Sequence, residues 1–238
     1  MKSKKTVTDI SVVLFFILQA VLGYLLQIKS GDTAIYLRYA TVIAACLFCF
    51  SFAERSTAYI CTQIGLIFTV FADRFLVLEN PPVQLPAMLF FSGAQIAYSI
   101  RIYLGDKNVI RRRVHLIARI AVTVIALAVT FAVLGANADA VALVSVFYYA
   151  NLILNAVFAF ANARQLWMLG IGFLLFIGCD TVIGFAFLDE YLSIPADSAI
   201  YDIINPGFDL AWAFYVPSQA LISASLWKRT VSAKENIA

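Results

Sequence analysis

The segment Gly172-Phe173-Leu174-Leu175-Phe176-Ile177-Gly178-Cys179-Asp180-Thr181 places a carboxylate inside an apolar run about long enough to cross a lipid bilayer. An aspartate costs roughly 2.5–3.5 kcal/mol at the centre of a membrane-spanning helix, so it is rarely found there without a polar partner or a function. A second carboxylate has the same setting, because Gly65 precedes Asp73 by the spacing that separates Gly172 from Asp180. We therefore interpret the chain as two halves that each carry one intramembrane aspartate.

The composition identifies the class of protein. The 238-residue chain is 63% hydrophobic and only 13% charged, with a mean hydropathy of +0.90, whereas about 25% of the residues in a soluble domain are charged. These values exclude an ordinary soluble domain and predict one integral membrane domain over residues 1–238. The net charge of +3 is too small to suggest nucleic-acid binding.

The apolar runs predict an all-α fold of about eight membrane-spanning helices with short connections. The expected spans cover about residues 10–28, 34–52, 58–78, 85–104, 114–134, 140–163, 166–188 and 208–227. The basic loop 107–113 separates two halves, 1–108 and 109–238, of four spans each. Both halves start from the same side of the membrane, so we expect a parallel 4+4 internal repeat related by an axis along the membrane normal.

Basic residues are distributed unequally between the two sets of connections. Thirteen, including Arg101, lie at the amino terminus, in the second, fourth and sixth connections and in the tail. The alternate set contains only Lys29, since Arg38, Arg74 and Arg119 lie within predicted spans. The positive-inside rule therefore predicts that both termini are cytoplasmic. We expect a multi-pass integral protein of the cell membrane.

The same topology predicts the depth of the two aspartates. Asp73 and Asp180 lie 18 and 16 residues beyond Arg55 and Arg164, which is about 24 to 27 Å at 1.5 Å per residue. We therefore expect both carboxylates past the midplane, toward the outer leaflet, where they can share one cavity.

The span after each aspartate contains an aromatic residue four positions before a glutamine. Phe91 precedes Gln95, and Tyr215 precedes Gln219. Gln95 and Tyr98 then share one face of a helix, as do Tyr215 and Gln219. A buried amide needs hydrogen-bond partners in lipid, and a carboxylate at the same site is the natural one. We expect these side chains to orient the aspartates or to bind polar atoms of a substrate.

Arg74 and Asn155 are further candidate substrate-binding residues. Arg74 either binds a lipid phosphate or extends from near the outer end of its span to the interface. Asn155 shares a helix face with Asn151, and either lines the cavity or forms hydrogen bonds between helices. The only histidine, His115, is expected at the cytoplasmic interface.

No metal or cofactor site is expected. Cys46-Leu47-Phe48-Cys49 has the spacing of metal ligands, but it is a single pair in an apolar run. All four cysteines lie in apolar runs, which indicates unpaired residues of the core.

Four segments carry a family resemblance: Phe71-Ala72-Asp73, Ala94-Gln95-Ile96-Ala97-Tyr98, Gly178-Cys179-Asp180-Thr181 and Phe214-Tyr215-Val216-Pro217-Ser218-Gln219-Ala220-Leu221-Ile222. Together, and in this order, they resemble the blocks of the lysoplasmalogenase-like membrane family, also called YhhN. The resemblance implies hydrolysis of the vinyl-ether bond of a lysoplasmalogen, releasing a fatty aldehyde and a glycerophospho-alcohol. It implies a lysophospholipid substrate drawn from membrane lipid, with Asp73 and Asp180 as the catalytic residues.

The chemistry of two buried carboxylates agrees with this implication. Burial and mutual repulsion favour one neutral and one charged carboxyl, as in glycoside hydrolysis, where one donates a proton and the other supports a cation or activates water. The residues leave the acid and the base unassigned. The alternative is a lipid or small-solute transporter or binding protein whose aspartates couple protons or hold a polar head group. A purely structural role for the aspartates is a third interpretation, and a retinal-binding receptor is disfavoured because no lysine lies within a span.

Overall fold

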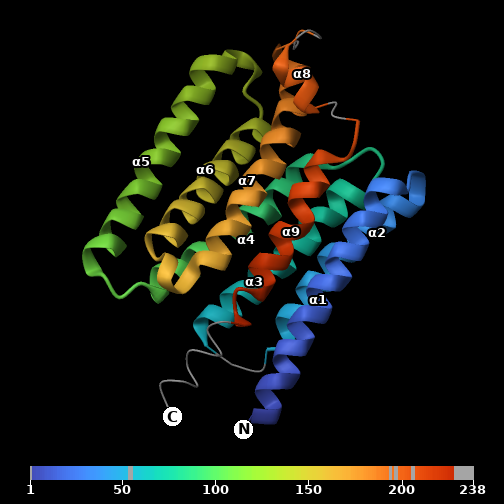
Figure 1. The fold of residues 1–238 in the computed structure, drawn as a ribbon. Coiled ribbons are helices and arrows are strands. Elements are labelled where there is room, and N and C mark those ends of the chain that lie inside the picture. Colours follow the sequence, from blue (N-terminus) through green and yellow to red (C-terminus); the bar gives the residue numbers. More distant parts are fainter. Residues whose placement is uncertain (1, 53–55, 193–194, 196–197, 205–206, 228–238) are drawn as a thin grey trace.

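The computed structural model describes residues 2–52, 56–192, 195, 198–204 and 207–227. The described residues are almost entirely helical and contain no strand, so the predicted all-α class is confirmed. The helices are α1 (Lys2–Ile28), α2 (Gly31–Phe50), α3 (Thr57–Asp73), the π-helical η1 (Arg74–Leu78), α4 (Gln84–Gly105), α5 (Val109–Leu134), the 3-10 helix η2 (Gly135–Asn137), α6 (Ala140–Ala161), α7 (Ala163–Leu192), α8 (Ala199–Ile204) and α9 (Leu210–Ala224) (Figure 1).

Six of the described helices are long and apolar enough to span a membrane: α1, α2, α3 with η1, α5, α6 and α7. Helix α5 shows the reason most clearly. Only His115 and Thr130 of this helix are buried, whereas Ile117 and Ile120 are 67% and 70% exposed. An apolar surface of this extent is stable against lipid rather than water. The chain is therefore a multi-pass membrane protein.

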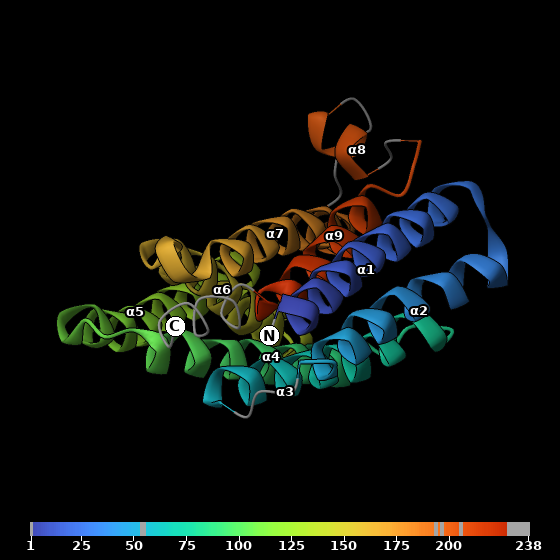
Figure 2. The same cartoon turned by 60° about the horizontal axis from the view of Figure 1, so that its bottom comes forward.

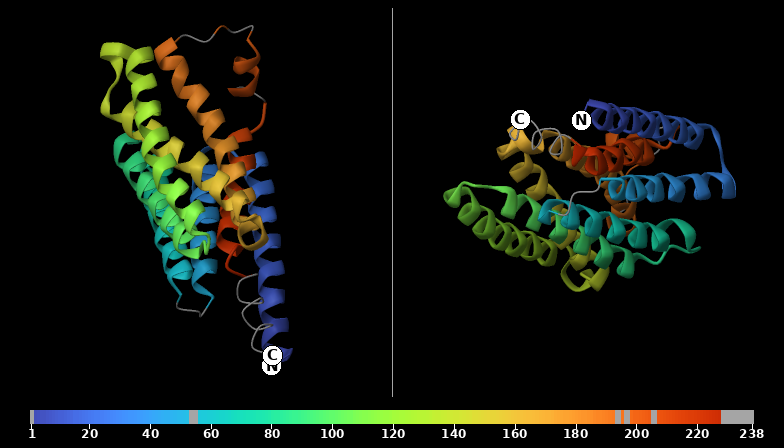
Figure 3. Two further views of the ribbon diagram at one scale, coloured as in Figure 1. Left: turned by 90° about the vertical axis from the view of Figure 1, so that its left-hand side faces the viewer. Right: turned by 90° about the horizontal axis from the view of Figure 1, so that it is seen from below.

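Helices α4 and α9 are not among these six, and both pack against several helices of the bundle, although α4 also has an exposed apolar face that includes Leu89 and Leu104. Helix α4 packs against α3 and α6, and α9 packs against α1, α2 and α7 (Figure 3). Both carry buried polar residues, namely Gln95 and Arg101 on α4 and Ser218 and Gln219 on α9. Neighbouring helices surround these side chains in place of lipid, so polar groups are tolerated there. That α4 and α9 complete a set of eight spans stays a prediction.

The expected loop position of Arg101 is wrong. Arg101 lies within α4 and is 1% exposed. Its guanidinium donates hydrogen bonds to the hydroxyl groups of Thr62 at 2.9 Å and Ser225 at 2.7 Å. Arg101 therefore joins α4 to α3 and to the end of α9, and a buried polar network replaces the water that a loop arginine would have.

Two glycines, each eight residues before one of the aspartates, lie at close contacts between helices. A Cβ atom at Gly65 of α3 would lie 2.4 Å from the ring of Tyr98 on α4. A Cβ atom at Gly172 of α7 would lie 3.2 Å from the backbone oxygen of Ser218 on α9. Each glycine that precedes an aspartate by eight residues thus permits close contact between the third and fourth long helices of its half. Gly184 has no such neighbour within 4 Å.

The two ends of the described chain meet at one end of the bundle. The indole N–H of Trp227 donates a hydrogen bond to the carboxylate of Asp9 at 3.0 Å. At the opposite end, α7 extends to Leu192, and α8 lies apart from the bundle within the connection predicted for 188–206 (Figure 2). The predicted start of the seventh span coincides with a break inside α7, where Leu166 has non-helical torsion angles (φ −124°, ψ 16°).

Candidate active site

Asp73 is the last residue of α3 and is 3% exposed. The hydroxyl of Tyr215, on α9, donates a hydrogen bond to its carboxylate at 2.6 Å. Tyr215 is itself 3% exposed. The pair therefore joins the end of α3 to α9 inside the bundle, and it brings together two residues that the sequence predicts for one site.

Asp180 lies on α7 and is partly buried. The hydroxyl of Tyr148, on α6, donates a hydrogen bond to its carboxylate. In the next residues of both helices, the hydroxyl groups of Tyr149 and Thr181 are hydrogen-bonded at 2.7 Å. Two adjacent polar contacts thus hold α6 against α7 at this level.

Phe176 connects the two aspartate–tyrosine pairs. This fully buried residue lies one helical turn before Asp180 on α7. Its ring centroid is 5.2 Å from that of Tyr215 and 6.3 Å from that of Tyr148, with edge-on geometry in both cases. Asp73 and Asp180 therefore belong to one cluster built from α3, α6, α7 and α9.

Gln95 and Asn155 form a second, adjoining cluster. The amide nitrogen of Asn155 donates hydrogen bonds to the side-chain and backbone oxygens of Gln95, both at 2.9 Å. The expectation that a carboxylate would be the partner of Gln95 is wrong, because Asn155 of α6 occupies the facing position. Both residues are fully buried and have no access to water, so their contact supplies hydrogen-bond partners that these polar groups would otherwise lack.

The same cluster contains Arg119, which the sequence places within a span but does not predict as a site residue. Its guanidinium donates hydrogen bonds to His115 Nε2 at 2.7 Å, to Asn151 Oδ1 at 2.6 Å and to the side-chain oxygen of Asn155. His115 is 2% exposed and stacks on Phe158, so it is buried between α5 and α6. Its expected depth at the cytoplasmic interface stays a prediction. The spacing of four residues between His115 and Arg119 places both on one face of α5 and could have revealed this contact.

Tyr98 and Gln219 are also buried, but neither contacts a predicted partner. The Tyr98 ring packs against Phe173, with ring centroids 5.3 Å apart, and against Gly65. Gln219 is 1% exposed, and its amide atoms have no hydrogen-bond partner among the described residues. Gln219 lies one turn beyond Tyr215 on α9, so its amide is one helical turn from the residue that donates a hydrogen bond to Asp73.

Arg74 begins the π-helical turn directly after Asp73. Its guanidinium pairs with the carboxylate of Glu79 at 3.0 Å and lies over the ring of Phe75. Both members of the ion pair are more than one-third exposed, at 47% and 38%. Arg74 is thus directed to the surface of the bundle and has a carboxylate partner, whereas Asp73 is directed to the interior.

Tyr148, the partner of Asp180, was not predicted as a site residue from the sequence. Tyr148, Asn151 and Asn155 follow each other at spacings of three and four residues, which places them on one face of α6. This polar stripe in an apolar helix is a signal that the sequence contains. The described residues contain no group of three or more His, Cys, Asp or Glu side chains that could hold a metal ion, and all four cysteines are free and buried.

The fold and the cluster define an all-helical, multi-pass membrane protein with a pair of acidic residues in its packed interior. The chain belongs to the YhhN family, whose model matches residues 33–226. This is the family that the four sequence segments resemble, and the match includes both aspartates and both tyrosines. No curated protein and no solved structure matches the chain.

Proposed function

We propose that this YhhN-family protein is a membrane-embedded hydrolase that cleaves the vinyl-ether bond of a lysoplasmalogen. The observation that carries the proposal is the arrangement of Asp73–Tyr215 and Asp180–Tyr148 on two sides of Phe176. Family membership supports the substrate class. The partial burial of the cluster supports acid–base chemistry, because few groups compete there for a proton.

A vinyl ether is hydrolysed in three steps, each with a role for a carboxyl group. A neutral carboxyl donates its proton to the alkene carbon that does not carry the ether oxygen, and an oxocarbenium ion forms at the other alkene carbon. An ionised carboxylate stabilises this cation and removes a proton from the water that attacks it. The resulting hemiacetal then collapses to the aldehyde. Its hydroxyl proton passes to the carboxylate that gave the first proton, and the other carboxyl returns its proton to the oxygen of the departing glycerophospho-alcohol. The two tyrosine hydroxyls orient the carboxyl groups, and Gln219 is available for a substrate oxygen.

The first experiment measures aldehyde release from a 1-alkenyl lysophospholipid by purified protein in detergent. We expect Asp73→Asn and Asp180→Asn each to reduce the rate about 10²- to 10⁴-fold, because each removes one acid–base group. The melting temperature and gel-filtration profile of each variant report whether it still folds. A folded double variant that keeps the wild-type rate would contradict the proposal.

Two further readouts identify the reaction. A matched lysolipid with a saturated ether should not react, because its carbon chain has no double bond to protonate. Hydrolysis in D₂O should place one deuterium on the carbon next to the aldehyde. The transporter alternative predicts flux of intact lipid across proteoliposomes without release of aldehyde.

A further inference from the structure

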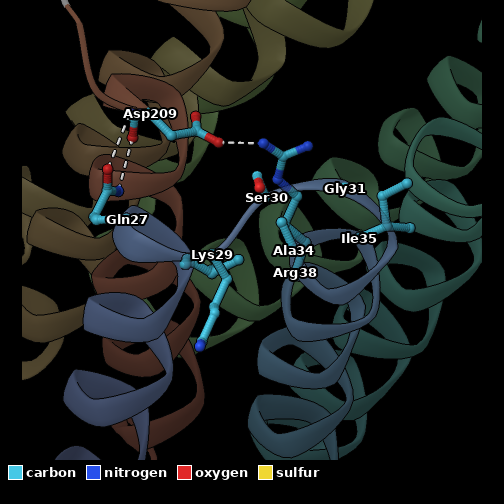
Figure 4. A pocket seen from close by; sticks show the side chains of 9 residues that line it. Gln27, Lys29, Ser30, Gly31, Ala34, Ile35, Arg38 and Asp209 are labelled. Carbon is cyan, nitrogen blue, oxygen red and sulfur yellow. Dashed lines mark hydrogen bonds and ion pairs between the residues drawn. The ribbon is translucent and has the colours of Figure 1, made fainter.

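A cavity with both apolar and charged lining residues opens where α1 ends, α2 begins and α9 begins. Its volume is about 440 Å³, and its lining includes Leu26, Lys29, Arg38 and Asp209 (Figure 4). Asp209 holds this corner together. Its backbone exchanges two hydrogen bonds with the side chain of Gln27, at 2.9 and 3.1 Å, and its carboxylate accepts one from Arg38. The walls are thus connected to one another across three helices.

The charges of this cavity are unbalanced. Lys29 and Arg38 contribute two positive charges, and Asp209 is the only acidic residue of the lining, so one positive charge is uncompensated. The side chain of Lys29 is exposed and has no partner among the described residues. The Nε–H group of Arg38 is buried and likewise has no hydrogen-bond acceptor within the described chain. The unpaired ammonium of Lys29, beside the Arg38–Asp209 ion pair, is a cationic donor of the kind that binds phosphate groups.

A short series of side chains connects the cavity to the proposed catalytic cluster. The guanidinium of Arg38 lies 5.7 Å from the ring centroid of Trp212, which meets Tyr215 edge-on at 5.0 Å. Tyr215 in turn donates its hydrogen bond to Asp73. From Asp209 to Tyr215 the rise along α9 is about 9 Å at 1.5 Å per residue. This separation is comparable with the glycerol backbone between the phosphate and the ether bond of a lysophospholipid.

We infer that this cavity is the site for the phosphodiester of a single-chain phospholipid, bound by Lys29 and Arg38. The inference rests on the proposed function, because it orders the substrate along the bundle, with phosphate at the cavity and the ether bond at Asp73. A phosphodiester carries one negative charge, which matches the uncompensated charge of the lining. Arg74, the phosphate candidate from the sequence, is paired with Glu79. Arg38 is likewise paired with Asp209, so Lys29 is the cation of the cavity lining that has no carboxylate partner among the described residues.

The test measures binding without requiring catalysis. A 1-alkyl lysophospholipid, whose saturated ether cannot react, and the matching 1-alkylglycerol are titrated in maltoside micelles, which contain no phosphate, and tryptophan fluorescence reports binding. We expect wild-type protein to bind the phospholipid at least tenfold more tightly. Lys29→Gln should weaken phospholipid binding about tenfold, as expected for the loss of a charge-assisted contact, and should leave alkylglycerol binding unchanged. Lys29→Glu should weaken it further.

Lys107→Gln is the matched control, because Lys107 is an exposed lysine in the connection between α4 and α5, at the other end of the bundle. It should bind both lipids as the wild type does. Equal affinity of wild-type protein for the two lipids, or unchanged binding by both Lys29 variants, would overturn the inference. Equal affinity for inorganic phosphate alone would also overturn it, since the alkyl chain would then contribute nothing. Phospholipid binding that depends on Lys29, together with no release of aldehyde from the 1-alkenyl lysophospholipid, would refute the hydrolase and leave the phosphate site standing.

Discussion

At the scale of single residues, each proposed catalytic carboxyl has one tyrosine hydroxyl as its partner. Tyr215 binds Asp73 and Tyr148 binds Asp180, from two different helices. A carboxyl group in an apolar interior has few alternatives for hydrogen bonding, so the tyrosine decides which carboxyl oxygen faces the substrate. The tyrosines therefore act through the aspartates, as positioning residues.

Replacing these hydroxyl groups tests that role. Tyr215→Phe and Tyr148→Phe should each lower kcat/KM for alkenyl lysophospholipid about 10- to 100-fold, because a hydrogen bond to a charged group contributes roughly 1.5–3 kcal/mol. Most of the loss should lie in kcat, since the carboxyl acts on the transition state. Tyr24→Phe is the control, because Tyr24 is 66% exposed on α1. Unaltered kinetics in both cluster variants would show that the hydroxyls do not position the carboxyls.

At the scale of helices, the cluster depends on how closely α7 and α9 approach each other. Gly172 lies against the backbone of α9, whereas Gly184 of the same helix faces open space. Backbone atoms cannot move aside as the end of a flexible side chain can, so the contact at Gly172 has little tolerance for added volume. The two glycines therefore form a matched pair for a packing experiment.

Gly172→Ala should lower stability and Gly184→Ala should not. The new Cβ atom at residue 172 would lie 2.8 Å from Ile222 Cγ1 and 3.2 Å from two backbone atoms of α9, a degree of overpacking that costs about 1–3 kcal/mol. At residue 184 alanine meets nothing and improves helix propensity by up to about 1 kcal/mol. Thermal unfolding in detergent measures both changes. A higher melting temperature for Gly172→Ala than for the wild type would contradict the close contact.

At the scale of the whole molecule, the described chain begins and ends on one side of the bundle, and the contact between Trp227 and Asp9 holds these ends together. An even number of spans follows if every long helix crosses the membrane. Arg101 no longer counts as a loop charge, but the connection between α4 and α5 still carries Lys107, with Arg111, Arg112 and Arg113 in the first turn of α5. These charges favour a cytoplasmic position for that connection.

Thiol labelling tests this topology. Single variants Lys107→Cys and Asp202→Cys should react with a membrane-impermeant maleimide from opposite sides, the first from the cytoplasm and the second from outside. Both positions are exposed. The four native cysteines are buried, so they remain in place as an internal blank. If both variants were labelled in intact cells, or if neither were labelled until the cells were permeabilised, the two positions would lie on the same side of the membrane and the proposed arrangement of the second half would be ruled out.

The sequence by itself determined the membrane class, most helix positions and the family. It also determined that Asp73 and Asp180 lie within apolar helical segments. Hydropathy, helix breakers and short motifs are local properties of the chain, so they can be read without the tertiary structure. Only the tertiary structure decided that Tyr148 faces Asp180, that Asn155 rather than a carboxylate faces Gln95, and that Arg101 and His115 are buried. It also decided that Lys29 and Arg38 share a cavity with Asp209. The physical reason is that hydrogen-bond partners depend on the rotation and separation of packed helices, which result from contacts between residues far apart in the chain.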